Sequence, residues 1–98
     1  MELEQLRVFA AVADEGSFTG AARRLYISHS TVSRTVTALE EELGVRLIER
    51  DNRFIALTKA GAVLREEAES LLDAAVAATA RVKAVSYTHL TLPTNMTV

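Results

Sequence analysis

Apolar residues recur at helical spacing through the first half of the chain and predict three helices in succession. The first covers residues 3–14 and ends before Gly16, a residue suited to the left-handed conformation that closes a helix. Its apolar face comprises Leu3, Leu6, Phe9, Ala10 and Ala13, widened by Val8 and Val12. We expect this helix to be core scaffold, packed across the back of the next two.

Two serines mark the starts of the second and third helices. Ser17 precedes a helix of about two turns and Ser28 precedes a longer one, and each hydroxyl can accept a hydrogen bond from a free amide of the first turn. Gly44 is expected to close the third helix. The apolar positions are Phe18, Ala21, Ala22 and Leu25, then Val32, Val36, Leu39 and Leu43.

The third helix carries an unusual polar face of short donors and acceptors and one long cation. Such side chains let a helix lie deep in a DNA major groove, close to the base edges. An ordinary amphipathic helix whose Ser and Thr face water is the alternative, and a short helix joined by a tight turn argues against it. The candidate base-reading residues are His29, Ser30, Thr31, Ser33, Arg34 and Thr37.

Alternating apolar residues after Gly44 predict two short strands around a turn at Asp51 and Asn52. A hairpin of this size is marginal alone and must pack on the helices. Arg50 and Arg53 would then project from its flanks or tip and reach phosphates or the adjacent minor groove. A surface loop with incidental arginines is the less favoured alternative.

A long helix is predicted from Lys59 to about Ala84, capped by Thr58. Its apolar residues follow intervals of four and three, the heptad spacing of a helix that pairs with another helix, so we expect homodimerisation. Packing of this helix onto its own domain stays open as the alternative. The predicted dimer seam comprises Leu64, Ala68, Leu71, Ala75, Ala78 and Val82.

Composition and charge narrow the picture further. The 98 residues, 49% hydrophobic and 24% charged, suit one small globular domain. The net charge is −2, yet residues 17–59 hold six Arg and one Lys against four Glu and one Asp, a net charge of +2 that suits a polyanion. With no cysteine, no signal-like N-terminus and no apolar run of membrane-spanning length, we expect a cytoplasmic protein.

Residues 85–98, VSYTHLTLPTNMTV, differ from everything before them: charge disappears, threonine becomes frequent and the only proline occurs. The string VSYTHLTLPT resembles the translation of a transposon-end sequencing adapter. We therefore expect a non-native tail, with the natural sequence diverging near Val85. The expected division is a DNA-binding domain over 1–58, a linker or dimerisation helix over 59–84 and the tail over 85–98.

Several segments resemble the N-terminal domain of LysR-type transcriptional regulators, and they occur in the same order and at the same spacing as in that family. They are LEQLRVFAAVADEGSFTGAARRLYIS, VSRTVTALEEELGVRLIER and LTKAG. The resemblance implies a mainly α fold, a winged helix-turn-helix with a short β-hairpin wing and a long C-terminal linker helix. It also implies a regulator that binds double-stranded DNA as a dimer, and an effector-sensing C-terminal domain that this chain lacks.

The resemblance also implies residue roles. Ser33 and Arg34 match groove-facing positions, while Phe18 and Thr19 fall where a helix N-terminus meets the DNA backbone. The family commonly has Gln followed by Pro or Ser where this chain has His29-Ser30, which affects base preference because an imidazole offers fewer hydrogen bonds than an amide.

Other functions find less support in the sequence. His29 has no carboxylate placed to orient it and no glycine-rich oxyanion element nearby, so we expect no enzyme activity. No metal-ligand spacing is present and no cofactor is implied; the run Glu40-Glu41-Glu42 is interpreted as a solvated helical stretch. The main rival is a helix-turn-helix used only for protein contact.

Overall fold

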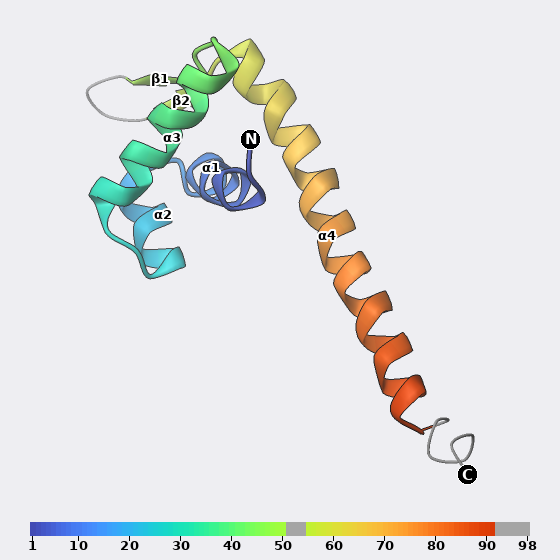
Figure 1. Cartoon of the computed structure of the whole chain (residues 1–98). Helices are drawn as coiled ribbons and strands as arrows, with labels where there is room; N and C mark the ends of the chain where they lie inside the picture. Colours follow the sequence, from blue (N-terminus) through green and yellow to red (C-terminus); the bar gives the residue numbers. More distant parts are fainter. Residues whose placement is uncertain (51–54, 92–98) are drawn as a thin grey trace.

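The predicted order of elements is confirmed in the structure (Figure 1). The computed structural model describes the backbone of residues 1–50 and 55–91, and side chains of these residues as far as Val85. Within these limits α1 (Leu3–Glu15), α2 (Phe18–Leu25) and α3 (His29–Leu43) precede a hairpin of β1 (Ile48–Arg50) and β2 (Ile55–Leu57), and α4 (Lys59–Thr91) leads away from the other helices.

Local caps define the helix-turn-helix. The Ser17 hydroxyl accepts from the Gly20 amide at 2.8 Å, and the Ser28 hydroxyl accepts from the Thr31 amide at 3.1 Å, as the sequence predicts. Gly44 closes α3 in the left-handed conformation at φ +71°. The ends of α2 and α3 are therefore determined by the residues beside them.

A single hydrophobic core joins α1, α2, α3 and the first strand. Phe9, Val36 and Leu39 are fully buried at its centre, and Ala21 of α2 joins them. Two predicted core positions are wrong: Leu3 and Leu43 remain 50% and 39% exposed. Each lies in a terminal turn of its helix, beyond the region that neighbouring helices cover.

The hairpin is antiparallel, with Ile48 opposite Leu57 and Arg50 opposite Ile55. Ile48 is buried, whereas Ile55 and Leu57 are partly buried and pack against the core. The two short strands therefore rest on the helices, as expected for a pair this small. The predicted turn residues Asp51 and Asn52 lie outside the described residues.

The start of α4 is held against the segment that leads into β1. The Thr58 amide donates to the Leu47 carbonyl at 3.0 Å, and the Thr58 hydroxyl donates to the Arg46 carbonyl at 2.6 Å. The same hydroxyl accepts from the Gly61 amide at 3.0 Å, which confirms the predicted cap. A Cβ at Gly61 would lie 2.0 Å from the Leu47 carbonyl oxygen, so only glycine allows this approach.

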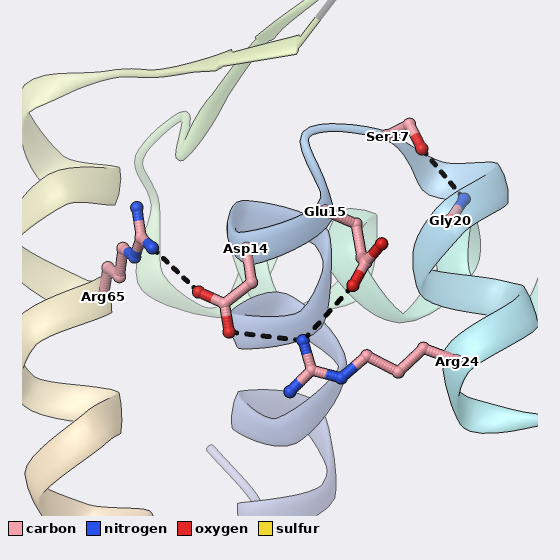
Figure 2. A network of polar contacts seen from close by, with 6 residues as sticks. All are labelled: Asp14, Glu15, Ser17, Gly20, Arg24 and Arg65. Carbon is pink, nitrogen blue, oxygen red and sulfur yellow. Dashed lines mark hydrogen bonds and ion pairs between the residues drawn. The ribbon is translucent and has the colours of Figure 1, made fainter.

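Ionic contacts connect α4 with the helix-turn-helix at the C-terminal end of α1 (Figure 2). Arg65 of α4 donates to one Asp14 oxygen at 2.8 Å, and Arg24 of α2 donates to the other at 3.3 Å. Arg24 also lies 3.6 Å from Glu15. One carboxylate thus bridges three helices, although all of these side chains are partly solvent-exposed.

The backbone of α4 stays helical to Thr91, beyond the expected end near Ala84. Residues 85–91 contain neither glycine nor proline, and each residue added to an existing helix gains a hydrogen bond without a new nucleation cost. The change of composition at Val85 therefore does not end the helix. No helix in the described part of the chain combines the length and apolar character needed to span a bilayer.

The close approach at Gly61 generates a stability prediction. Gly61→Ala is expected to lower the free energy of unfolding by about 3 kcal/mol, because the methyl group fits only if α4 moves away from β1. Urea unfolding followed by circular dichroism would measure the change. Gly44→Ala is the matched control: a Cβ there meets nothing within 4 Å, and only the positive φ should cost about 1 kcal/mol. Equal losses for the two variants would contradict the steric argument.

The bridge at Asp14 generates a second prediction. Asp14→Asn is expected to lower the free energy of unfolding by about 1 kcal/mol or less, since exposed ion pairs are weak. The loss should shrink in concentrated salt, which screens such pairs. Asp73→Asn is the control, because Asp73 lines the same hollow of about 240 Å³ but forms no ion pair among the described residues. A salt-independent loss, or the same loss for Asp73→Asn, would show that the bridge contributes nothing measurable.

Candidate nucleic-acid interface

The polar face of α3 begins at its N-terminal end and is open to solvent there. His29, Ser30 and Arg34 are exposed, whereas Ser33 and Thr37 are half-buried. No ion pair involves Arg34 among the described residues, so its guanidinium is available to an external anion. The first two turns of α3 therefore present one cation among short hydrogen-bonding side chains.

Two threonine hydroxyls on α3 already have partners within the protein. The Thr31 hydroxyl lies 2.8 Å from the Ser28 hydroxyl, and the Thr35 hydroxyl donates to the Thr31 carbonyl at 2.7 Å. Thr31, predicted to read bases, is thus half-buried and takes part in the cap at the start of the helix. A hydroxyl can still form another hydrogen bond, because it carries one donor and two acceptor positions.

Three of the predicted contact residues come together around one aromatic ring. The Arg50 guanidinium carbon lies 5.3 Å from the centre of the Phe18 ring, a distance that allows a cation–π contact. The rings of Phe18 and His29 meet edge to face, with centres 5.7 Å apart and planes at 77°. Phe18 of α2 therefore connects the hairpin with the first residue of α3.

Thr19 and Arg53 are the two other residues that the sequence predicts to contact the DNA backbone. Thr19 is exposed in the first turn of α2, beside the aromatic cluster in sequence. Arg53 lies outside the described residues.

Glu40 corrects the interpretation of the glutamate run. Its side chain is only 8% exposed, and its Oε2 accepts from the amides of Leu47 at 2.8 Å and Ile48 at 3.2 Å. Glu40 follows Val32 by eight positions and Val36 by four, so helical spacing places it on the buried stripe. That signal was present in the sequence, but the amide donors come from residues beyond the helix.

Two arginines lie next to the buried carboxylate. Arg46 Nε is 3.8 Å from Glu40 Oε2, and Arg50 Nη2 is 3.9 Å from Glu40 Oε1. These residues and Thr37 line an open hollow of about 360 Å³ between α3 and the hairpin. Arg46 was not among the predicted contacts, although its side chain is 68% exposed. Glu41 lines the same hollow, so two arginines lie next to two glutamates on the hairpin side of α3.

Three arginines, one each in α1, α2 and α4, form ion pairs with carboxylates of α1. Arg24 and Arg65 form ion pairs with Asp14 (Figure 2). Arg7 donates two hydrogen bonds to Glu4, and these hydrogen bonds hold the pKa of the Glu4 carboxyl below its usual value and raise that of Arg7. Arg23 of α2 and Arg81 of α4 form no ion pair within the described part of the chain, so unpaired arginines are not confined to α3.

The predicted dimer seam divides into two parts. Leu64 packs against the core of its own chain and Ala68 has no exposed surface. These two residues are on the side of α4 that meets α1, so Ala68 is not available to a second molecule. Farther along, Leu71 and Val82 are 42% and 68% exposed, and Ala78 is also exposed, whereas Ala75 is half-buried.

The described residues contain no cluster of three or more potential metal ligands. Every buried side-chain nitrogen or oxygen among them has a hydrogen-bond partner.

Comparison with known proteins gives a consistent result. Residues 3–62 match the family described as bacterial regulatory helix-turn-helix protein, lysR family. The chain is 46% identical over 86 residues to the HTH-type transcriptional regulator ClcR of Pseudomonas putida, which covers 88% of this chain and 29% of ClcR. It is 46% identical over 70 residues to the HTH-type transcriptional activator AaeR of Escherichia coli K12, covering 71% of this chain and 23% of AaeR. The chain thus spans less than a third of these relatives.

Solved structures show the same likeness. A BenM_DBD/catB site 1 DNA complex superimposes with a TM-score of 0.85 at 40% identity, covering 88% of this chain and 97% of that one. A CbnR_DBD–DNA complex gives a TM-score of 0.84 at 42% identity, covering 88% and 99%. Full-length CbnR, a LysR family transcriptional regulator, gives 0.82 at 43% identity, covering 86% of this chain and 29% of CbnR.

Proposed function

This chain belongs to the lysR family of bacterial regulatory helix-turn-helix proteins, and we propose that it binds double-stranded DNA sequence-specifically to regulate transcription. The observation that carries the proposal is the N-terminal half of α3, where His29, Ser30 and Arg34 are exposed and Arg34 forms no ion pair with any described residue. The likeness to domains solved in complex with DNA supports it along most of the chain.

In this proposal α3 lies in the major groove. The exposed His29, Ser30 and Arg34 contact base edges there, with the half-buried Thr31, Ser33 and Thr37 at the margin. An arginine at this position can pair with guanine through two hydrogen bonds or with a phosphate.

The surrounding residues bind the sugar-phosphate backbone. Phe18 and Thr19 lie in the first turn of α2, whose free amides favour an anion. Arg50 from β1 and Arg53, which lies between the two strands in sequence, contact the flanking phosphates or minor groove. These contacts fix the position of α3 on the duplex and carry little sequence information.

We also propose that two copies pair through the outer part of α4. The seam then starts at Leu71 and continues through Ala75, Ala78 and Val82, since Leu64 and Ala68 are used within the chain. A helix of this length with valines exposed along its outer half gains stability from a partner, because isolated helices are marginal in water. Two copies of α3 would then bind half-sites separated by whole turns of DNA, about 10 base pairs each.

The remaining assignments follow from this proposal. We take residues 1–58 as the DNA-binding unit, 59–84 as the linker helix and 85–98 as adapter-derived. Because it acts on DNA, we place the protein in the cytoplasm. Effector binding belongs to the part of the relatives that this chain does not span, and no cofactor or catalytic step is assigned to the chain.

Arg34 provides the direct test. Arg34→Ala is expected to weaken binding to a duplex enriched from a random-sequence library about tenfold, because a well-placed arginine contact contributes roughly 1–3 kcal/mol. Fluorescence anisotropy over a range of salt concentrations would measure affinity and the number of phosphates contacted.

Arg81→Ala is the matched control, since Arg81 is an exposed arginine of outer α4 and its loss changes the net charge equally. Its affinity should stay close to that of the unchanged protein. No enrichment of any sequence, together with no binding to duplex DNA in low salt, would reject the proposal and favour a helix-turn-helix used for protein contact.

The dimer has its own test. Sedimentation equilibrium is expected to give twice the mass of one chain, and Leu71→Glu should shift the equilibrium to monomers because like charges would face each other without solvent. Ala77→Glu is the control: it is exposed and lies about 200° around the helix from Ala75. A monomeric unchanged protein, or equal effects of the two variants, would contradict pairing along this seam.

A further inference from the structure

A buried anion lies directly behind the cations of the wing. Glu40 is 8% exposed, and one of its oxygens accepts from the backbone amides of Leu47 and Ile48. Its other oxygen lies 3.9 Å from the guanidinium of Arg50. The same side chain therefore holds the backbone at the start of β1 and an arginine at its end.

Arg50 is restrained from a second side as well. Its guanidinium lies 5.3 Å from the centre of the Phe18 ring, and Phe18 in turn meets the His29 ring edge to face. Arg50 is consequently located between an anion near the end of α3 and an aromatic ring near its beginning. Contacts run without interruption from Glu40 through Arg50 and Phe18 to the first residue of α3.

This arrangement has two consequences for binding DNA. A guanidinium already held in place loses less conformational freedom when it contacts a phosphate, so correct complexes benefit. The buried negative charge also reduces the attraction of the wing to any duplex, whatever its sequence. The charge effect lowers both affinities, whereas the positioning effect helps only the complex in which a correctly seated α3 brings a phosphate to the held guanidinium. Positioning therefore widens the difference between specific and non-specific binding.

We propose that Glu40 is a positioning residue that determines sequence discrimination by setting Arg50 and the wing against α3. This inference rests on the proposed DNA-binding function. In this inference Glu40 does not contact DNA. It changes the ratio of the affinity for a specific duplex to the affinity for a non-specific duplex.

Glu40→Gln separates positioning from folding. The amide oxygen of glutamine can still accept from Leu47 and Ile48, whereas the charge that attracts Arg50 is lost. Glu41→Gln is the matched control, since it removes the same charge from the adjacent, exposed residue of α3. Affinities of the 98-residue chain would be measured for a library-enriched duplex and for a scrambled duplex of equal length.

Glu40→Gln is expected to reduce the ratio of the two affinities about tenfold, a coupling within the range for residues in contact, with binding to the scrambled duplex unchanged or stronger. Glu41→Gln should leave the ratio unchanged. Arg50→Lys, which keeps the charge but lacks the planar guanidinium, should reduce the ratio similarly, and combining it with Glu40→Gln should add little.

The outcomes are distinguishable. If both affinities of Glu40→Gln fall equally, or its ratio equals that of the unchanged protein, this inference is rejected while the proposed function stands. If Glu40→Gln and Arg50→Lys have fully additive effects, Glu40 does not act through Arg50 and the inference is rejected too. If the unchanged protein enriches no sequence, the proposed function fails, and this inference fails with it.

Discussion

Four backbone amides converge on Glu40, and the path of the chain after α3 depends on them. The Glu40 carbonyl accepts from Gly44 at 2.9 Å and Val45 at 3.3 Å, while its carboxylate accepts from Leu47 and Ile48. Because buried amides without partners are costly, these bonds favour one route from α3 into β1. The adjoining carbonyls of Arg46 and Leu47 then receive the Thr58 contacts that hold the start of α4. The hairpin and α4 are therefore both positioned from the end of α3.

Features determined by neighbouring residues could be predicted from the sequence. Ser17, Ser28 and Thr58 cap their helices, and Gly16 and Gly44 close theirs, because a hydroxyl or a glycine acts within one turn of its own position. The hairpin was predictable for the same reason, from alternation on both sides of a polar turn. The family was predicted from several segments that resemble LysR-type regulators in the same order. Local chemistry alone does not identify a family.

Features that depend on distant residues were harder to predict. Spacing assigns Leu64, Ala68 and Leu71 to one stripe of α4, but the proximity of α1 decides that Ala68 is covered while Leu71 is 42% exposed. Glu40 was mispredicted for the same reason. Its charge indicated a solvated residue, but the backbone amides of residues 47 and 48 donate to its carboxylate and make its burial favourable. The contact of Phe18 with Arg50 likewise joins residues of α2 and β1 that no local pattern relates.

The fold also determines which charges of a chain with net charge −2 remain free to act on an approaching polyanion. Acids of α1 are used within the protein: Glu4 binds Arg7, and Asp14 binds Arg24 and Arg65 (Figure 2). The charges in each pair largely offset each other, so they have little effect on an approaching polyanion. Salt screens the unpaired charges that lie farther from it. Arg34 has no such partner in the described part of the chain. Attraction to a polyanion therefore depends on which charges the fold leaves uncompensated near α3, and the net charge of the sequence does not give this information.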